Sequence, residues 1–301
     1  MTIYNSIGSN KRKTWFMMIF FVLFFFAVSY VLGRSMGYGS SFVGIILIIS
    51  GLMSFASYYY SDKIVLSMSG AKPANDKEHS ELINIVENLS IASGLPKPKV
   101  YVIQDSALNA FATGRDPKHA AVAATSGILA ALSKSELEGV IGHELSHVKN
   151  YDTRLMGVVS ILAGSLAILA DFFMRSLWFG GNRDDDNRGG GGAIFMVIGI
   201  AAAILAPIAA MLIQMAISRR REFLADANGA LLTRYPEGLA RALEKISADR
   251  HVLKTATNAT AHLFIENPFK ADAGRKSKAF LAGLFSTHPP VEERIKILRS
   301  M

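Results

Sequence analysis

Four long apolar runs dominate the pattern of hydrophobic and polar positions along the chain. They extend over Thr14 to Gly33, Ser41 to Tyr60, Leu155 to about Met174, and Ala193 to about Ser218. A helix that crosses a bilayer needs about 20 mostly apolar residues, and each run approaches or exceeds that length. The pattern therefore predicts a multi-pass membrane protein whose transmembrane helices, about four in number, form two hairpins.

The charged residues beside these runs predict how the chain is oriented. Basic clusters precede the first run, at Lys11 to Lys13, and follow the fourth, at Arg219 to Arg221. Because Lys and Arg accumulate on the cytoplasmic side of membrane helices, we expect both termini and the segment Ser61 to Arg154 in the cytoplasm. The glycine-rich and acidic loop at 179–192 is then expected on the outer side.

The sequence between and after the hairpins has the periodicity of a mixed α and β domain. Short strands are predicted at "KVYVIQ", "LNAFATG" and "HAAVAATSG". Helices are predicted before them, in "HSELINIVENLSIASG", and after them, in "ILAAL" and in "SELEGVIGHELSHVKN", which Ser133 or Ser135 can cap. Further helices are predicted at "REFLADANGALLTR", "PEGLARALEKISADR" and "HPPVEERIKILRS". The fold class is therefore α+β and mostly helical.

These segments divide the chain into four expected parts. Residues 1–61 are expected to form an amino-terminal transmembrane hairpin, and residues 155–218 a second one. Residues 62–154 and 219–301 are expected to form the first and second parts of one cytoplasmic domain. The second hairpin interrupts that domain.

Composition limits the chemistry that this chain can perform. It contains no cysteine, so any transition-metal site must use histidine and carboxylate ligands, which suit zinc. The 32 basic and 24 acidic residues give a formal net charge of +8. Because the basic residues cluster beside apolar runs, we attribute this charge to contact with the lipid bilayer and expect no nucleic-acid partner.

The stretch "GVIGHELSHVKN", Gly139 to Asn150, carries the first candidate chemistry. On a helix, His143 and His147 lie at the edge of the apolar face, and Glu144 falls among apolar positions. Burial of an unpaired carboxylate is costly, so Glu144 needs a cation, a proton or a polar cavity nearby. An H-E-x-x-H pattern meets this need when both imidazoles bind one zinc ion and the glutamate activates a water molecule. The alternative is a helix whose histidines form hydrogen bonds inside a core.

A catalytic zinc site needs a third protein ligand. Glu222 in "SRRREFLADANGA" stands out, with Asp226 four residues later on the same helix face. This spacing allows Glu222 to bind the ion and Asp226 to hydrogen-bond a ligand imidazole. The alternative is an exposed acidic pair that compensates the three neighbouring arginines. The remaining histidines are further candidates for the third ligand: His79, His119, His251, His262 and His288.

The predicted topology favours Glu222 as the third ligand over the alternative of an exposed acidic residue. Two spans separate His147 from Glu222, so both residues are expected on the cytoplasmic side. Glu222 follows the fourth run by about four residues, which places it roughly 6 Å from the membrane end of that helix at 1.5 Å per residue. The predicted ion therefore lies at the cytoplasmic surface of the membrane.

Nearly the whole chain resembles the HtpX family of membrane zinc metalloproteases, which are related to the eukaryotic prenyl-protein endoprotease. The basic start, the first hairpin and four motifs carry the resemblance: "NAFATG" (109–114), "GHELSH" (142–147), "SRRREFLAD" (218–226) and "STHPPVEERI" (286–295). It implies a zincin-like metalloprotease domain in which His143, His147 and Glu222 bind one Zn²⁺ per chain and Glu144 is the general base. It also implies a protease of the bacterial inner membrane that cuts misfolded or damaged membrane proteins from the cytoplasmic side.

The resemblance suggests two more roles. Asn109, Ala110 and Phe111 are expected to form an edge strand beside the site, to which an extended substrate adds by backbone pairing. The alternative is a buried strand. His288 in "THPP" is expected to approach the site and stabilise the oxyanion, unless it only begins the last helix.

The main hypothesis from the sequence is a zinc endopeptidase that acts on polypeptides. One alternative is a non-proteolytic membrane scaffold or chaperone-like protein with a structural zinc site. Glu144 disfavours it, because a structural site needs no base. Another alternative is a zinc hydrolase that acts on a lipid or another small substrate.

Overall fold

The computed structural model describes residues 3–35, 40–180, 208, 219–257, 260–266, 268 and 289–301. The fourth apolar run, except Ile208, lies outside the described residues, as do His288 and all but the first two residues of the loop predicted at 179–192. The described part contains the predicted strands, the H-E-x-x-H helix and Glu222.

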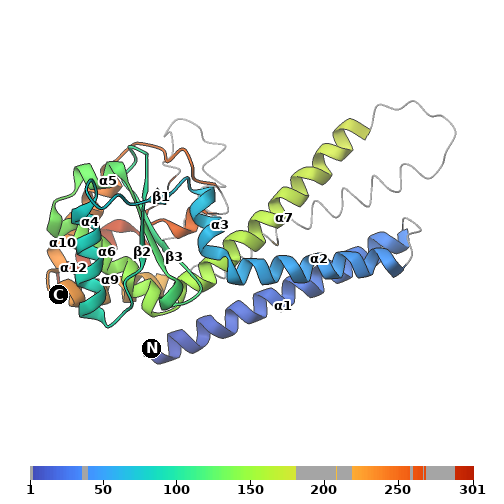
Figure 1. The fold of residues 1–301 in the computed structure, drawn as a ribbon, viewed down its shortest axis with the longest axis horizontal. Coiled ribbons are helices and arrows are strands. Elements are labelled where there is room, and N and C mark those ends of the chain that lie inside the picture. The colour runs from blue at the N-terminus through green and yellow to red at the C-terminus, as the bar shows by residue number, and fades with distance from the viewer. Residues whose placement is uncertain are drawn as a thin grey trace.

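Helices make up most of the described chain, and four short strands lie among them (Figure 1). The elements up to the H-E-x-x-H helix are α1 (Ile3–Ser35), α2 (Ser40–Tyr59), α3 (Ser61–Met68), β1 (Lys72–Pro73), α4 (Ser80–Ser93), β2 (Lys99–Ile103), β3 (Ala110–Thr113), β4 (Ala121–Thr125), α5 (Ser126–Ala131) and α6 (Lys134–Lys149). Those that follow are α7 (Asp152–Gly180), α9 (Arg219–Thr233), α10 (Pro236–Ala248) and α12 (Val291–Leu298), with 3₁₀ turns at Pro117–His119 and Ala261–Leu263. The predicted, mostly helical α+β fold is confirmed.

The strands form one mixed sheet in the order β1-β2-β4-β3. The central strands β2 and β4 are parallel, with Lys99 opposite Ala121. The outer strands β1 and β3 are antiparallel to their neighbours, and Phe111 of β3 lies opposite Ala123. β3 is therefore an edge strand of this sheet.

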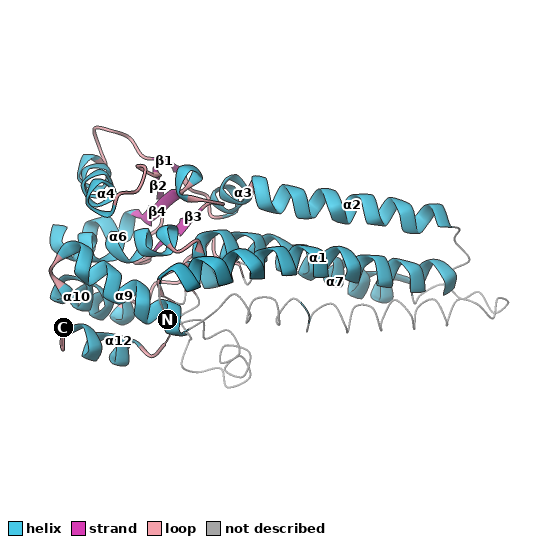
Figure 2. Ribbon diagram, turned by 90° about the horizontal axis from the view of Figure 1, so that it is seen from below, coloured by secondary structure: helices cyan, strands magenta, loops and turns pink. Residues whose placement is uncertain are grey.

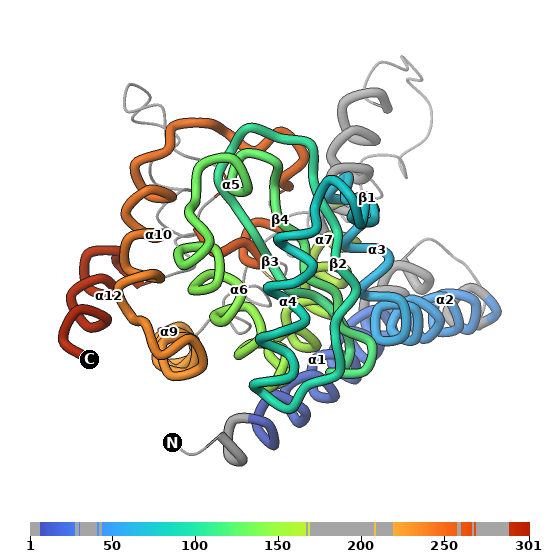
Figure 3. Tube along the Cα trace, turned by 60° about the vertical axis from the view of Figure 1, so that its left-hand side comes forward, coloured from blue at the N-terminus to red at the C-terminus, as the bar shows by residue number. Residues whose placement is uncertain are grey.

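The two faces of the sheet pack against different parts of the chain, because side chains alternate between the faces along each strand. Val102, Ala112 and Val122 join a core with α4, α5, α6, α9 and α10. Ile103 and Phe111 point to the other face, where they pack with α3, the start of α7 and the pair Leu263 and Phe264. The helix α6 lies between β3 on one side and α4, α9 and α10 on the other sides, so it is almost wholly buried (Figure 3).

Three long helices, α1, α2 and α7, extend from the same side of this domain (Figures 1 and 2). α1 packs along α7 through an apolar cluster that includes Met17, Phe21 and Leu162. The helix α1 begins at Ile3, well before the apolar run, so its basic cluster is helical and lies beside the domain (Figure 2).

No single helix in the described part of the chain is both long and apolar enough to cross a membrane. The stretch Gly44–Tyr59 of α2 and the helix α3 meet the criterion of length and composition together, with a bend of 83° between them. The number of transmembrane helices and their orientation remain predictions.

Local signals explain where the helices around the H-E-x-x-H motif begin and end. Gly94 ends α4 with a φ of 70°, the left-handed conformation that favours glycine. Ser133 is the N-cap of α6, and its backbone N–H donates to the Glu136 carboxylate at 2.7 Å. Tyr151, with a φ of 59°, connects α6 directly to α7. This tight connection places Asp152, the first residue of α7, next to His147.

Candidate metal centre

The two histidines of the motif lie one turn apart on α6, and both are buried. Their ring centroids are 4.7 Å apart and the rings are nearly perpendicular, at 87°. The two Nε2 atoms face each other at 3.1 Å. An i, i+4 spacing on a helix therefore brings two nitrogen lone pairs to one point, as the sequence predicts.

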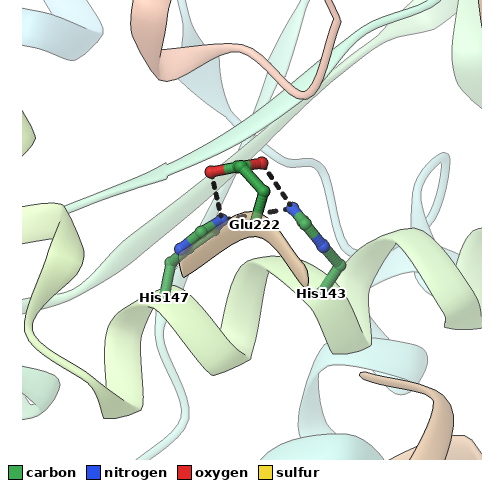
Figure 4. A group of neighbouring side chains, drawn as sticks. All are labelled: His143, His147 and Glu222. Carbon is green, nitrogen blue, oxygen red and sulfur yellow. Dashed lines mark hydrogen bonds and ion pairs between the residues drawn. The ribbon is translucent and has the colours of Figure 1, made fainter. Parts of the chain in front are cut away.

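Glu222 completes this group from α9, which packs across α6. Its carboxylate points between the two imidazoles (Figure 4). One oxygen lies 3.7 Å from Nε2 of His143 and the other 3.6 Å from Nε2 of His147. A metal ion needs several His, Cys, Asp or Glu side chains close together. In the described part of the chain, His143, His147 and Glu222 form the one such group of three.

The separations fit a tetrahedral zinc ion. Ligand atoms at about 2.0–2.1 Å from a tetrahedral centre are about 3.4 Å apart. The two Nε2 atoms here are 3.1 Å apart, and each lies 3.6–3.7 Å from a different oxygen of Glu222. With one ligand atom taken from each residue, the three atoms lie within 4.8 Å of one another, so a small adjustment of the carboxylate would bring them to an ion. Two imidazoles and one carboxylate are also a ligand set that leaves a fourth position open for a water molecule or a substrate.

An aspartate contacts the Nδ1 atom of each histidine. Asp226 lies 2.8 Å from Nδ1 of His143, and Asp152 lies 3.0 Å from Nδ1 of His147. A carboxylate accepts a hydrogen bond from the N–H at Nδ1, which leaves Nε2 as the free lone pair. These contacts assign the tautomer that metal binding requires.

The electrostatics of the site favour a cation. Burial lowers the pKa of His147, but the negative charges of Glu222 and Asp152 outweigh it and raise the pKa to about 9. For His143, burial is the stronger influence and lowers the pKa, although Asp226 opposes it. The carboxylates of Glu222, Asp152 and Glu144 thus make the surroundings of His147 negative, which suits a cation.

Arginines balance the two aspartates. The guanidinium of Arg294 makes two bonds to Asp226, at 2.7 and 2.8 Å, and Arg221 lies 3.5 Å from Asp152. Burial raises the pKa of Asp226, but Arg294 outweighs this effect and lowers the pKa to about 2. The carboxylates of Glu144 and Glu222 are buried in the same region. A divalent cation would balance the charges of those two carboxylates, which is a second observation that fits a metal ion.

The structure also locates the other predicted residues. Glu144 is buried on α6 beside His143, and its charge helps to raise the pKa of His147. Asn109 directly precedes β3, and Ala110 and Phe111 begin that strand, so this segment is both at the sheet edge and buried. Of the competing histidines, the four that the structure describes do not reach the metal group. His79, His119 and His251 are partly or fully exposed, and His262 contacts α7 at Ser160 and Met156.

Two residues of this site are absent from the expectations drawn from the sequence. Asp152 follows His147 by five positions and begins the helix that comes directly after the H-E-x-x-H helix. This short separation in sequence could have predicted that Asp152 lies near His147. Arg294 lies in "STHPPVEERI", where it looks like an ordinary charged residue of an amphipathic helix. Only the fold shows that its side chain is almost completely buried against Asp226.

Comparisons with known proteins found similar sequences over the whole chain. Residues 76–301 match Peptidase family M48. The chain is 45% identical over 302 residues to a Protease HtpX homolog of Thermoanaerobacter pseudethanolicus, covering 100% of this chain and 98% of that one. It is also 45% identical over 299 residues to a Protease HtpX homolog of Tropheryma whipplei, covering 99% and 98% of the two chains. The crystal structure of S. mikatae Ste24p matches 90% of this chain with 18% identity and a TM-score of 0.47, and this chain spans 61% of its length.

The helix that carries H-E-x-x-H, together with the glutamate from a second helix, defines a metallopeptidase. The chain belongs to Peptidase family M48, and the resemblance to the HtpX proteases is confirmed. Its substrates are therefore polypeptides.

Proposed function

We propose that this chain is a membrane-embedded zinc endopeptidase that cleaves misfolded or damaged membrane proteins from the cytoplasmic side. The observation that carries the proposal is the buried group of His143, His147 and Glu222, with Glu144 on the same helix. A structural zinc site is closed by four protein ligands and needs no base beside them, whereas this group offers three ligands and an additional carboxylate.

The long helices support a membrane location. Large apolar side chains of α1 and α2 are exposed over several turns, including Trp15, Phe16, Ile48 and Leu52. Exposed large apolar side chains in this number on two neighbouring helices are typical of contact with lipid rather than water. The basic residues beside these helices then favour a cytoplasmic site at the membrane surface.

The proposed chemistry assigns one role to each of these side chains. A zinc ion held by His143, His147 and Glu222 would acidify a water molecule and polarise the scissile carbonyl. Glu144 takes the proton from the water as its oxygen attacks the carbonyl carbon. It then donates that proton to the leaving nitrogen as the C–N bond breaks, and the products are a carboxylate and an amine.

The edge strand β3 is the proposed place for the substrate backbone. The Thr125 N–H donates to the Asn109 carbonyl at 3.0 Å, so the backbone groups of Asn109 point toward β4. Because backbone groups alternate along an antiparallel strand, those of Ala110 and Ala112 point away from β4. The Ala110 carbonyl already accepts from the Ile265 N–H at 3.0 Å. None of the described residues outside the sheet bonds to the backbone of Ala112. We therefore place the pairing with substrate at Ala112, one residue beyond the predicted segment.

The test compares wild type with Glu144→Gln in detergent. Glu144→Gln is expected to keep its zinc content and to lose cleavage of a membrane-protein substrate by a factor of about 10² to 10⁴, the usual contribution of a general base. The measurements are zinc per chain and the initial rate of cleavage. Undiminished cleavage by this variant would overturn the mechanism.

Two controls separate the alternative functions. A scaffold or chaperone-like protein would keep its activity in a chelator and in Glu144→Gln. A lipid hydrolase would bind lipid without slowing amide hydrogen exchange at Asn109 to Gly114, whereas a peptide substrate is expected to protect this strand.

A further inference from the structure

The basic end of α1 contains a buried polar side chain, Asn10, which is only 2% exposed. It lies next to the loop between α6 and α7. Its Nδ2 donates to the carbonyl of Asn150 at 3.0 Å and to Oδ1 of Asp152 at 2.6 Å. Its Oδ1 accepts from Nη1 of Arg221 at 3.2 Å. All the polar atoms of this amide therefore have partners in the domain that holds the metal centre.

These partners connect Asn10 to two of the three residues of the metal group. Asp152 uses its other oxygen, Oδ2, to hold Nδ1 of His147 at 3.0 Å. Arg221 directly precedes Glu222 on α9 and lies 3.5 Å from the oxygen of Asp152 that Asn10 contacts. A carboxamide donates from its nitrogen and accepts on its oxygen, so one side chain can hold an aspartate and an arginine together.

The pattern of bonds distinguishes this role from simple anchoring of α1. Anchoring is already served by the apolar cluster with α7, and by the bond to the carbonyl of Asn150. The shortest bond of Asn10 goes instead to the carboxylate that orients His147. Without that bond, the one contact that the described residues make with Oδ1 of Asp152 is Arg221 at 3.5 Å, so the carboxylate would be held less firmly against the imidazole.

We propose that Asn10 is a positioning residue of the metal centre, which holds Asp152 against His147 and Arg221 beside Glu222. This inference rests on the proposed zinc site and adds that the amino-terminal helix helps to build it. The packing of α1 against α7 thereby becomes a condition for tight metal binding, although α1 contributes no ligand.

The experiment measures zinc affinity of the full-length chain in detergent, by competition with a chromophoric chelator. Asn10→Leu keeps the approximate volume of the side chain and removes both polar atoms. It is expected to weaken zinc binding about tenfold, which is the lower end of the effect of groups that orient a metal-binding histidine. The matched control is Thr14→Val, one turn later on α1, whose buried hydroxyl donates to the backbone carbonyl of Asn10 and contacts neither Asp152 nor Arg221 in the described part of the chain. That variant is expected to bind zinc as wild type does.

Three further measurements show whether the effect acts through Asp152. The absorption spectrum of the Co²⁺-substituted protein is expected to change in Asn10→Leu and not in Thr14→Val. The double variant Asn10→Leu with Asp152→Asn is expected to lose less zinc-binding free energy than the sum of the losses in the two single variants, because both substitutions act on one contact. Asn10→Asp keeps the acceptor for Arg221 but places a carboxylate against Asp152. It is expected to weaken zinc binding at least as much as Asn10→Leu does. It provides the test if Asn10→Leu does not fold.

Wild-type zinc affinity and an unchanged cobalt spectrum in a folded Asn10→Leu or Asn10→Asp variant would overturn the proposal. Fully additive losses with Asp152→Asn would overturn it too. These readouts need no catalysis. A wild-type chain that binds zinc but cleaves no polypeptide would contradict the proposed function and leave this test valid.

Discussion

Each histidine of the metal centre is backed by an aspartate, and each aspartate is in turn contacted by an arginine. The pair behind His143 is the tighter of the two, because Arg294 makes two bonds to Asp226 and all of these groups are almost fully buried. Such a pair orients the carboxylate and keeps it ionised, so that it accepts a hydrogen bond from the N–H at Nδ1.

Replacing Arg294 with methionine tests this role. The substitution removes the cation that holds the pKa of Asp226 at about 2, and it leaves a buried carboxylate without its main partner. Breaking a buried ion pair on one side costs about 3–5 kcal/mol, so we expect Arg294→Met to lower the free energy of unfolding by that amount. Denaturant titration measures the stability, and chelator competition is expected to show weaker zinc binding.

Arg299→Met provides the matched control. Arg299 directly follows α12, the helix that carries Arg294, but it is exposed and pairs with Glu237 and Glu244 at the surface. Exposed pairs contribute about 0–1 kcal/mol, so this variant is expected to resemble wild type. Equal effects of the two substitutions would refute a special role for Arg294.

The helix α6 contributes both histidines, and the contacts at its first turn fix where it begins. Glu136 accepts from the Ser133 N–H at 2.7 Å and from Nζ of Lys245 on α10 at 2.6 Å. Burial tends to raise the pKa of Glu136, but these two partners outweigh it and hold the pKa below 4.5. The ionised carboxylate thus joins the start of α6 to α10.

The stabilising effect of Glu136 is expected to depend on pH. Because its pKa is depressed in the folded chain, its contribution is present above the unfolded value and disappears as pH falls through the folded value. At neutral pH, Glu136→Gln is expected to lower the free energy of unfolding by about 1 kcal/mol. The difference from wild type should shrink below pH 4.5. Denaturant titrations in a chelator measure it without the pH dependence of metal binding, and Glu138→Gln on the same helix is the control. A difference that persists unchanged at low pH would contradict this account.

Glycines set the distance between the helices that carry the ligands. A Cβ atom on Gly229 of α9 would lie 2.9 Å from the backbone nitrogen of His143. Gly229→Ala is therefore expected to push α9 and Glu222 away from α6. We expect a loss of about 1–3 kcal/mol in stability, as for other overpacked sites, together with weaker zinc binding. Gly51→Ala on α2, where a Cβ atom meets nothing within 4 Å, is the control for thermal unfolding and zinc affinity. Tight zinc binding by Gly229→Ala would show that the close approach is not needed.

Elements whose signals are local could be predicted from the sequence. The strands β2, β3 and β4 are short apolar segments that turn residues separate, and Gly94 and Ser133 lie at helix ends. The helix α3 was not predicted, because its residues continue directly from α2 and only a bend of 83° separates the two. In the site, helical spacing was enough for the two histidines. By contrast, Arg294 and Asp226 are 68 positions apart, and Asn10 and Asp152 are 142 apart, so no local pattern connects them.

At the scale of the whole molecule, the metal group joins two parts of the chain that α7 separates. α6 precedes α7 and contributes the histidines, whereas α9 follows it in the chain and contributes Glu222. The helices α1, α2 and α7 leave the domain on one side (Figure 2). The first of them, α1, also contacts Asp152 beside the metal centre through Asn10. A bound ion would therefore stabilise the assembly of distant segments as well as supply chemistry.

Metal removal tests this global role. A ligand that binds only the folded state stabilises it by about 4 kcal/mol when present at about 1,000 times its Kd. Removing the ion would also leave the buried carboxylates of Glu144 and Glu222 without a divalent cation. We therefore expect EDTA to lower the Tm of the full-length chain in detergent, and excess zinc to restore it. Glu222→Ala removes one ligand and is expected to lose most of this response, whereas Glu244→Ala, on the exposed surface of α10, should keep it. If the Tm responds equally to EDTA in wild type and Glu222→Ala, the stabilising metal is bound elsewhere, because a site that lacks its third ligand cannot couple α9 to α6.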